Sequence, residues 1–285
     1  MGSTGCIEKN VSWVNLMNRL TVVKIGGNVI DDPKKLKAFL QDFSELQGLK
    51  ILVHGGGKIA TQLSDELGIE AKLIEGRRIT NQESLRVVTM VYAGLINKNI
   101  VAQLQAFQCN AIGLSGADGN LIKATKRPVK QNSSGEGVID YGFVGDLNEQ
   151  SVNSIRMKNL LEAGFIPVFS AITHDGEGQL LNTNADTIAS AISVAMAGLY
   201  RVSLVYCFEK KGVLIDVADE NSIVREINLQ KYTRLKEDGI IYEGMIPKLD
   251  NAFKAIENGV NEVFIGKSDE IAWLNKKVFG TRLIP

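Results

Sequence analysis

The chain has 285 residues, with 32 basic and 32 acidic side chains, so its formal charge at pH 7 is zero. This balance argues against a nucleic-acid-binding protein, because phosphate contacts need clustered lysines and arginines, and no apolar run reaches the roughly 18 residues that would span a bilayer. Three widely spaced cysteines and two histidines indicate no disulfide framework and make a histidine metal site or a Ser-His-Asp triad hard to assemble. The cysteine pattern fits a cytoplasmic protein.

From residue 21 onward, short β-branched runs alternate with amphipathic stretches. The runs predict buried strands at 21–25, 51–53, 111–114, 166–170, 202–207 and 262–265. The stretches between them predict helices at 33–47, 57–67, 82–106, 149–163, 185–197 and 247–258. Such alternation is typical of an α/β protein with a mainly parallel sheet and helices on both faces.

Two segments depart from this rhythm. Residues 1–20 carry no recognisable chemistry, and we expect a leader that is disordered or forms a short helix. Residues 126–145 contain a serine- and glycine-rich loop, which predicts a hairpin excursion. If the chain has two lobes, we expect their junction near 180–200, where a glycine- and asparagine-rich loop precedes a new strand.

Two glycine loops follow the first two predicted strands, Gly26–Gly27 and Gly55–Gly57. Parallel sheets bind ligands at the carboxyl ends of their strands. Consecutive glycines expose backbone N–H groups there, which suits an anion such as a phosphate. For each loop taken alone, a tight βα turn without a ligand is the alternative.

Two familiar nucleotide motifs fit the sequence poorly. Gly266-Lys267-Ser268 ends like a P-loop, but position 261 is Asn where the motif requires glycine. Gly55-x-Gly57-x-x-Ala60 formally matches a dinucleotide fingerprint, which leaves a nucleotide-dependent oxidoreductase open as an alternative. That motif gives no explanation of the first glycine loop.

Three further groups of polar residues precede or follow predicted elements. A polar stretch at 182–186 precedes an alanine-rich helix, Lys248 follows Pro247 in the first turn of another helix, and Arg78 follows a loop glycine. A lysine in a first turn opposes the helix dipole unless an anion binds nearby. Each group alone has an ordinary explanation: a helix cap, a solvated lysine and a surface salt bridge.

Taken in order, these segments resemble the amino-acid kinase family over about residues 21–285. The motifs that carry the resemblance are VKIGGN, VHGGGK, EGRRIT, GLSGADG, LNTNAD, EGMIPK and GTRLIP. The resemblance implies an αβα sandwich around a mainly parallel sheet. It also implies an N-terminal lobe, residues 21–198, that binds an acyl amino acid and forms the dimer, and a C-terminal lobe, residues 199–285, that binds ATP.

Within the family, the motifs are most similar to those of members that act in arginine biosynthesis. The implied reaction is ATP-dependent phosphorylation of the γ-carboxylate of N-acetyl-L-glutamate by a homodimer, with Mg²⁺ carried by ATP. Another N-acyl-L-glutamate, such as the N-succinyl compound, or a related amino-acid substrate stays open. A non-catalytic sensor on the same fold is disfavoured because both lysines and the aspartate of the motifs are retained.

The resemblance also assigns roles to individual residues. It implies catalytic roles for Lys24 and Lys248, which stabilise the transferred phosphoryl group, and for Asp186, which organises both lysines. The implied phosphoryl-binding residues are Gly26 and Gly27, and the implied substrate-binding residues are Gly55, Gly56, Arg78 and Asn182. The implied nucleotide-binding residues are Glu209, Lys210, Lys211, Gly212, Val213, Leu214, Ile240, Ile241 and Tyr242. One departure is clear: Phe208-Glu209 stands where the family usually has a hydroxyl residue and an aspartate.

This chemistry needs no general base, because a γ-carboxylate is already ionised at neutral pH. The obstacle is charge repulsion from the triphosphate, which lysines, backbone amides and Mg²⁺ offset. We therefore interpret His54 as a loop-packing residue and not as a catalytic one. The apolar residues of 82–106 favour a helix that pairs across a two-fold axis, with a core helix as the alternative.

Overall fold

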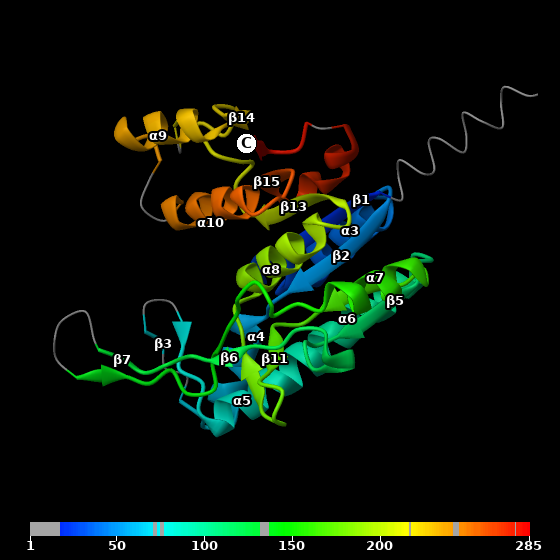
Figure 1. The fold of residues 1–285 in the computed structure, drawn as a ribbon, viewed down its shortest axis with the longest axis vertical. Coiled ribbons are helices and arrows are strands. Elements are labelled where there is room, and N and C mark those ends of the chain that lie inside the picture. Colours follow the sequence, from blue (N-terminus) through cyan, green and yellow to red (C-terminus); the bar gives the residue numbers. More distant parts are fainter. Residues whose placement is uncertain are drawn as a thin grey trace, which may run out of the picture.

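The computed structural model describes residues 18–70, 73–74, 77–131, 137–216, 218–241, 245–276 and 278–285, so most of the predicted leader lies outside the described residues. Its centre is an eight-stranded sheet in the order β14-β16-β15-β13-β1-β2-β10-β5 (Figure 1). The six strands from β5 to β15 run parallel, and β16 is antiparallel to β15. The predicted mainly parallel sheet is confirmed.

All six predicted strands are present in this sheet. Its members are β1 (Arg19–Ile25), β2 (Leu49–His54), β5 (Ala111–Leu114), β10 (Ile166–Phe169), β13 (Arg201–Phe208), β14 (Glu226–Ile227), β15 (Glu262–Lys267) and β16 (Thr281–Leu283). In β1, Leu20 and Val22 on one face and Val23 and Ile25 on the other are all fully buried. Because successive side chains of a strand point to opposite faces, both faces of the sheet are covered.

Helices flank the sheet (Figure 1). They are α2 (Gly27–Ile30), α3 (Pro33–Ser44), α4 (Gly57–Glu66), α5 (Gln82–Val88), the π-helical η1 (Thr89–Ile96), α6 (Asn97–Ala106), the 3₁₀ turn η2 (Asp118–Asn120), α7 (Ser154–Glu162), α8 (Ala185–Ala197), α9 (Leu229–Glu237), α10 (Ile246–Glu257) and the 3₁₀ segment η3 (Ser268–Lys276). Helix α8 packs on β13 and β1, and α10 on β15, whereas α3 packs between α6 and η3. The expected αβα layering is confirmed.

The helix predicted at 82–106 is one continuous run, Gln82–Ala106, made of α5, η1 and α6. By length and composition it is apolar enough to cross a membrane, although the sequence has no uninterrupted apolar run of that length. A core helix passes the same test, and α6 packs against β5 and β10. Met90 and Leu95 in η1 remain about half exposed.

The predicted excursion at 126–145 forms two small antiparallel pairs. Strand β6 (Thr125–Lys126) pairs with β9 (Gly145–Asp146), and β7 (Lys130–Gln131) pairs with β8 (Val138–Ile139). Two further two-stranded sheets are β3 (Leu73–Ile74) with β4 (Arg77–Arg78), and β11 (Ile172–His174) with β12 (Leu180–Asn182). These small sheets gather at one end of the central sheet, at the lower left of Figure 1.

The strands of the two expected lobes occupy the two halves of the sheet. Strands β1, β2, β5 and β10 come from residues 21–198 apart from the start of β1, and β13 to β16 come from residues 199–285. Because β1 and β13 pair over seven residues, a single sheet runs through both halves. The boundary at residue 198 stays a prediction.

Candidate active site

A cleft of about 770 Å³ opens at the carboxyl ends of β1 and β2. It is lined by the two glycine loops, the first turn of α8 and residues from β4, β9 and β12. Of the residues assigned to catalysis, phosphoryl binding and substrate binding, those that line this cleft are Lys24, Gly26, Gly27, Gly55, Gly56, Arg78, Asn182 and Asp186. The structure therefore brings together all of this set except Lys248.

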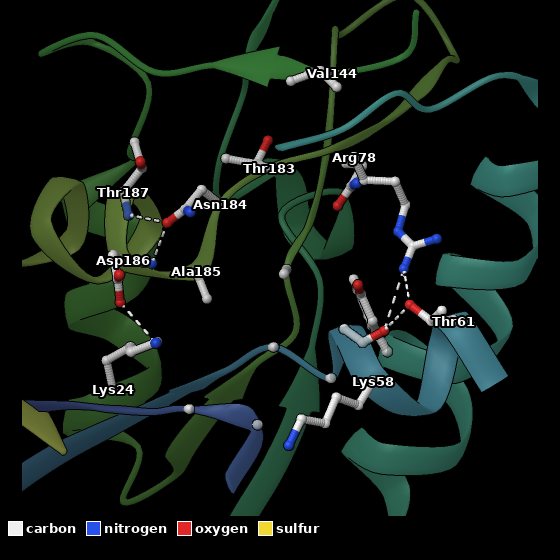
Figure 2. Close-up of a pocket in the computed structure, with 18 of the residues that line it drawn as sticks. Lys24, Lys58, Thr61, Arg78, Val144, Thr183, Asn184, Ala185, Asp186 and Thr187 are labelled. Carbon is white, nitrogen blue, oxygen red and sulfur yellow. Dashed lines mark hydrogen bonds and ion pairs between the residues drawn. The ribbon is translucent and has the colours of Figure 1, made fainter. Parts of the chain in front are cut away.

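Lys24 and Asp186 point toward each other at one side of the cleft, opposite Arg78 (Figure 2). Lys24 Nζ lies 2.8 Å from Asp186 Oδ1, and the two side chains are 12% and 36% exposed. Asn184 caps α8, since its Oδ1 accepts hydrogen bonds from the backbone N–H groups of Asp186 and Thr187 at 2.8 and 3.2 Å. The helix cap that was one explanation of the polar stretch is confirmed, and it fixes the turn from which Asp186 reaches Lys24.

Lys248 lies in the first turn of α10, near the same cleft. Its Nζ is 4.0 Å from the centre of the Phe208 ring, and its side chain lines a small cavity together with Asp186. Within the described part of the chain, the ion pair of Asp186 is with Lys24 and not with Lys248. The prediction that Asp186 organises both lysines stays a prediction.

The second glycine loop is fixed by backbone conformation and by His54. Gly56 has φ +148°, and a Cβ atom there would lie 2.2 Å from Ile96 Cδ1, so only glycine fits without displacement. His54 is fully buried, its Nδ1 lies 2.9 Å from Gly55 O, and its Nε2 lies 3.1 Å from Asn97 Nδ2. Burial lowers the pKa of His54 to about 4. His54 is thus a neutral packing residue beneath the loop, as predicted.

Arg78 and Asn182 approach the cleft from two of the small sheets. Arg78 Nη2 donates to Thr61 Oγ1 at 2.6 Å and to Gly57 O at 3.3 Å (Figure 2). Arg78 Nη1 is buried without a hydrogen-bond partner among the described residues. Asn182 Nδ2 donates to Thr80 Oγ1 at 3.0 Å. With its described neighbours Arg78 therefore makes hydrogen bonds to uncharged acceptors. It does not make the surface salt bridge that was the alternative.

A second cavity, of about 380 Å³, adjoins the cleft and shares Gly27 and Lys58 with it. The predicted nucleotide-binding residues that line this cavity are Glu209, Lys210 and Gly212, and Lys248 lines it as well. A narrow pocket beside it is lined by Lys210, Gly212, Val213, Leu214, Ile240 and Ile241. Lys211 instead places its Nζ 3.7 Å from Glu220 Oε2, and Tyr242 lies outside the described residues.

Sequence reasoning missed several residues of the cleft, notably Lys58, Arg127 and Asp146. Lys58 was part of the quoted VHGGGK motif, and its place in the first turn of a helix was an available signal. Arg127 and Asp146 stand at the two ends of the excursion and meet because β6 pairs with β9. Arg127 Nε donates to both Asp146 carboxylate oxygens, at 3.0 and 3.1 Å.

A lysine-bearing, glycine-lined cleft at the carboxyl edge of a parallel sheet defines an anion-binding α/β protein. Residues 19–267 match the amino acid kinase family. The chain belongs to this family, and it is a kinase.

Curated relatives agree with this assignment, and a solved structure shares the fold. The chain is 52% identical over 270 residues to the acetylglutamate kinase of Cytophaga hutchinsonii. This alignment covers 94% of this chain and 99% of that protein. It is 49% identical over 268 residues to the acetylglutamate kinase of Bacteroides thetaiotaomicron, again covering 94% and 99%. The fold is similar to that of N-acetylglutamate synthase from Neisseria gonorrhoeae, with a TM-score of 0.76 and 19% identity over 100% of this chain and 64% of that chain.

Proposed function

We propose that this kinase transfers the γ-phosphoryl group of ATP to the γ-carboxylate of N-acetyl-L-glutamate, a step of arginine biosynthesis in the cytoplasm. One observation carries the proposal: a chain 52% identical to an acetylglutamate kinase over almost its whole length places a lysine, two glycine loops and an arginine around one cleft. The lining of the cleft includes four cations that can attract the carboxylates of such an acceptor, namely Lys24, Lys58, Arg78 and Arg127.

Two neighbouring spaces suit the two substrates. We place the acylglutamate in the 770 Å³ cleft, against Gly55, Gly56, Arg78 and Asn182. The nucleotide then occupies the adjoining cavity of the second lobe, with its phosphates directed toward Gly27, the glycine that both spaces share. This arrangement brings the phosphoryl group to the acceptor carboxylate at the carboxyl end of β1.

The chemistry is the stabilisation of negative charge. The acceptor carboxylate is ionised at neutral pH, so it needs no base, and His54 lies buried beneath the loop. Lys24 and Lys248 offset the repulsion between the carboxylate and the triphosphate. A unit-charge contact at about 4 Å is worth about 4 kcal/mol at an effective dielectric near 20, before desolvation. Asp186 holds Lys24 in place and takes no part in proton transfer.

Mg²⁺ suits this site as a companion of ATP. Magnesium is commonly held by one or two carboxylates together with substrate phosphates and water. Glu209 supplies a carboxylate to the lining of the nucleotide cavity, and the described residues contain no cluster of three or more metal-binding side chains. When bound, the ion would neutralise phosphate charge, and Glu209 is the residue that we expect to face it.

A coupled assay tests the reaction. The purified enzyme is incubated with ATP, Mg²⁺ and N-acetyl-L-glutamate in hydroxylamine, which converts an acyl phosphate to a hydroxamate that is detected as its coloured iron(III) complex. We expect hydroxamate and ADP in equal amounts, and neither without the acylglutamate. ADP release without hydroxamate would refute a carboxylate acceptor, and binding of a nicotinamide cofactor without turnover of ATP would favour the oxidoreductase alternative.

Arg127 favours a second candidate substrate, an N-acylglutamate whose acyl group ends in a carboxylate, such as the N-succinyl compound. The Arg127 side chain lines the cleft and is only 9% exposed. Its Nε and Nη2 bind Asp146, while its Nη1 is buried without a partner among the described residues. A terminal carboxylate would accept a hydrogen bond from Nη1, whereas the methyl of an acetyl group has no acceptor to offer.

Comparing acyl groups on two enzymes tests this candidate. This second candidate predicts that wild type uses N-succinyl-L-glutamate at least as well as the N-acetyl compound, and that Arg127→Gln loses about tenfold or more in kcat/KM for the succinyl substrate alone. Arg156→Gln is the matched control, because Arg156 does not line the cleft, and it should leave kcat/KM for both substrates unchanged. Equal losses for both substrates in Arg127→Gln would refute a specific contact with the acyl carboxylate.

We also propose a homodimer that pairs through η1. Met90 and Leu95 are exposed there by 51% and 55%, on a run whose neighbouring apolar side chains are buried, and a second copy of the same helix is a complementary apolar partner. Light scattering should give twice the mass of one chain for wild type and a single-chain mass for Leu95→Lys. A monomeric wild type would refute this assembly.

A further inference from the structure

The ring of Phe208 lies beside both lysines of the proposed phosphoryl site. Lys248 Nζ is 4.0 Å from the ring centroid, and Lys24 Nζ is 5.9 Å from it. An ammonium group within about 6 Å of an aromatic centroid is attracted by the negative face of the ring. One side chain therefore attracts two cations that repel each other.

The position of this ring follows from the sheet. Phe208 ends β13, two residues after Tyr206, and Tyr206 is in register with Lys24 on β1. Alternate residues of a strand share a face, so these three side chains project from the same face of the sheet. The rings of Tyr206 and Phe208 stack, with centroids 5.9 Å apart and planes at 17°. The strand and the stacked tyrosine thus fix the ring before any ligand binds.

A ring holds a lysine differently from a carboxylate. An ammonium group has three N–H donors, and a carboxylate partner both occupies donors and competes with an incoming phosphate for the positive charge. The face of a phenyl ring attracts the charge but carries no acceptor atom. Lys24 has the carboxylate of Asp186, whereas in the described residues the only side-chain partner found for Lys248 is the Phe208 ring.

We propose that Phe208 is a positioning residue, which holds Lys248, and less closely Lys24, beside the phosphoryl path while leaving the donors of Lys248 free for phosphate oxygens. The proposal rests on the proposed kinase function. It gives a physical reason for the departure at this position, where the resembling family usually has a hydroxyl residue. A hydroxyl could bind one ammonium group through its oxygen, but it would occupy a donor.

Substitutions that remove the aromatic ring but keep an apolar side chain at position 208 test the proposal. Phe208→Leu keeps an apolar side chain but removes the ring face, and we expect it to lower kcat about five- to thirtyfold, the scale of a partly desolvated cation–π contact. The KM for N-acetyl-L-glutamate should stay within about twofold, and Phe208→Trp should retain most of the turnover.

Phe43→Leu is the matched control, because the Phe43 ring also lies beside a lysine, 5.3 Å from Lys50 Nζ. The Phe43 side chain is fully buried and does not line the cleft. The kcat of Phe43→Leu should not change below its unfolding temperature.

A fluorinated series sharpens this test. Fluorine atoms withdraw electrons from the ring with little change of shape, so mono-, di- and trifluorophenylalanine placed at position 208 should lower kcat step by step. A flat series in an active enzyme, or a Phe208→Leu enzyme with wild-type kcat, would overturn the positioning role and leave the proposed function intact.

A spectroscopic readout does not depend on turnover. Lysines methylated with ¹³C-formaldehyde give one methyl signal each, and the signal missing from Lys248→Arg identifies Lys248. We expect this signal to be shifted upfield by the ring current in wild type and to move to the ordinary position in Phe208→Leu. An unshifted wild-type signal would refute the contact between Lys248 and the Phe208 ring, whether or not the enzyme is active. Inactivity toward acylglutamates would instead refute the proposed function.

Discussion

Lowering the pH should destabilise this protein through His54. The imidazole is fully buried at the end of β2. Its Nδ1–H donates to Gly55 O, and its Nε2 accepts from Asn97 Nδ2, which also donates to Val168 O at 2.9 Å. A second ring proton would replace the acceptor at Nε2 with a donor that faces another donor. The neutral ring is therefore the form that the fold requires.

The size of the effect follows from the two pKa values of His54. Burial lowers the pKa from 6.5 to about 4 in the folded protein. Between these values the unfolded chain binds a proton that the folded chain does not, so stability is complete above pH 6.5 and falls as the pH drops toward 4. With about 1.4 kcal/mol per pH unit, the loss is about 2.5 kcal/mol by about pH 4.5.

Urea unfolding at about pH 7 and about pH 4.5 measures this loss. His54→Gln keeps a donor and an acceptor but cannot be protonated. Between the two pH values, its free energy of unfolding should therefore not show the drop of about 2.5 kcal/mol that His54 causes in wild type. Equal losses in wild type and His54→Gln would refute a buried neutral imidazole beneath the glycine loop.

Three further predictions concern the cleft. Lys24→Ala and Lys248→Ala should each lower kcat at least about a hundredfold with a smaller change in substrate KM, and near-normal turnover in steady-state assays would contradict their assignment. Arg78→Lys should raise the KM for the acylglutamate far more than the KM for ATP, because an ammonium cannot reproduce the guanidinium fork; a rise in the ATP KM instead would place Arg78 with the nucleotide. Gly56→Ala should lower the melting temperature and activity, since its Cβ would lie 2.2 Å from another side chain, whereas Gly198→Ala, with nothing within 4 Å and away from the cleft lining, is the control and should do neither.

The central strands could be predicted because their residues must be apolar on both faces of a covered parallel sheet. The same logic could not find helix α9, Leu229–Glu237, whose buried apolar side chains are Tyr232 and Leu235. Its start did carry a local signal, since Asn228 Oδ1 accepts a hydrogen bond from Lys231 N as a helix cap. The two-residue strand β14 and the three-residue β16 are too short for any periodicity to show.

The site residues could be predicted to the extent that they follow strands. Gly26, Gly55 and Lys24 converge because the carboxyl ends of neighbouring parallel strands meet at one edge. Arg127 and Asp146 converge for a different reason, the closure of a hairpin excursion by two-residue strands. No spacing in the sequence specifies that pairing, so this part of the cleft emerged only from the structure.

The partners of the cations around the cleft indicate where substrate charge goes. Lys24 and Arg127 are paired with carboxylates, Asp186 and Asp146, which offset the cost of taking each cation out of water. Among the described neighbours, Arg78 instead contacts uncharged oxygens and Lys248 an aromatic ring. A cation held by uncharged partners keeps more of its attraction for an arriving anion, because no carboxylate has to be displaced. By this reasoning we propose that Arg78 receives the substrate carboxylate and Lys248 the phosphoryl oxygens, while Lys24, which is paired with Asp186, contributes most where negative charge increases during transfer.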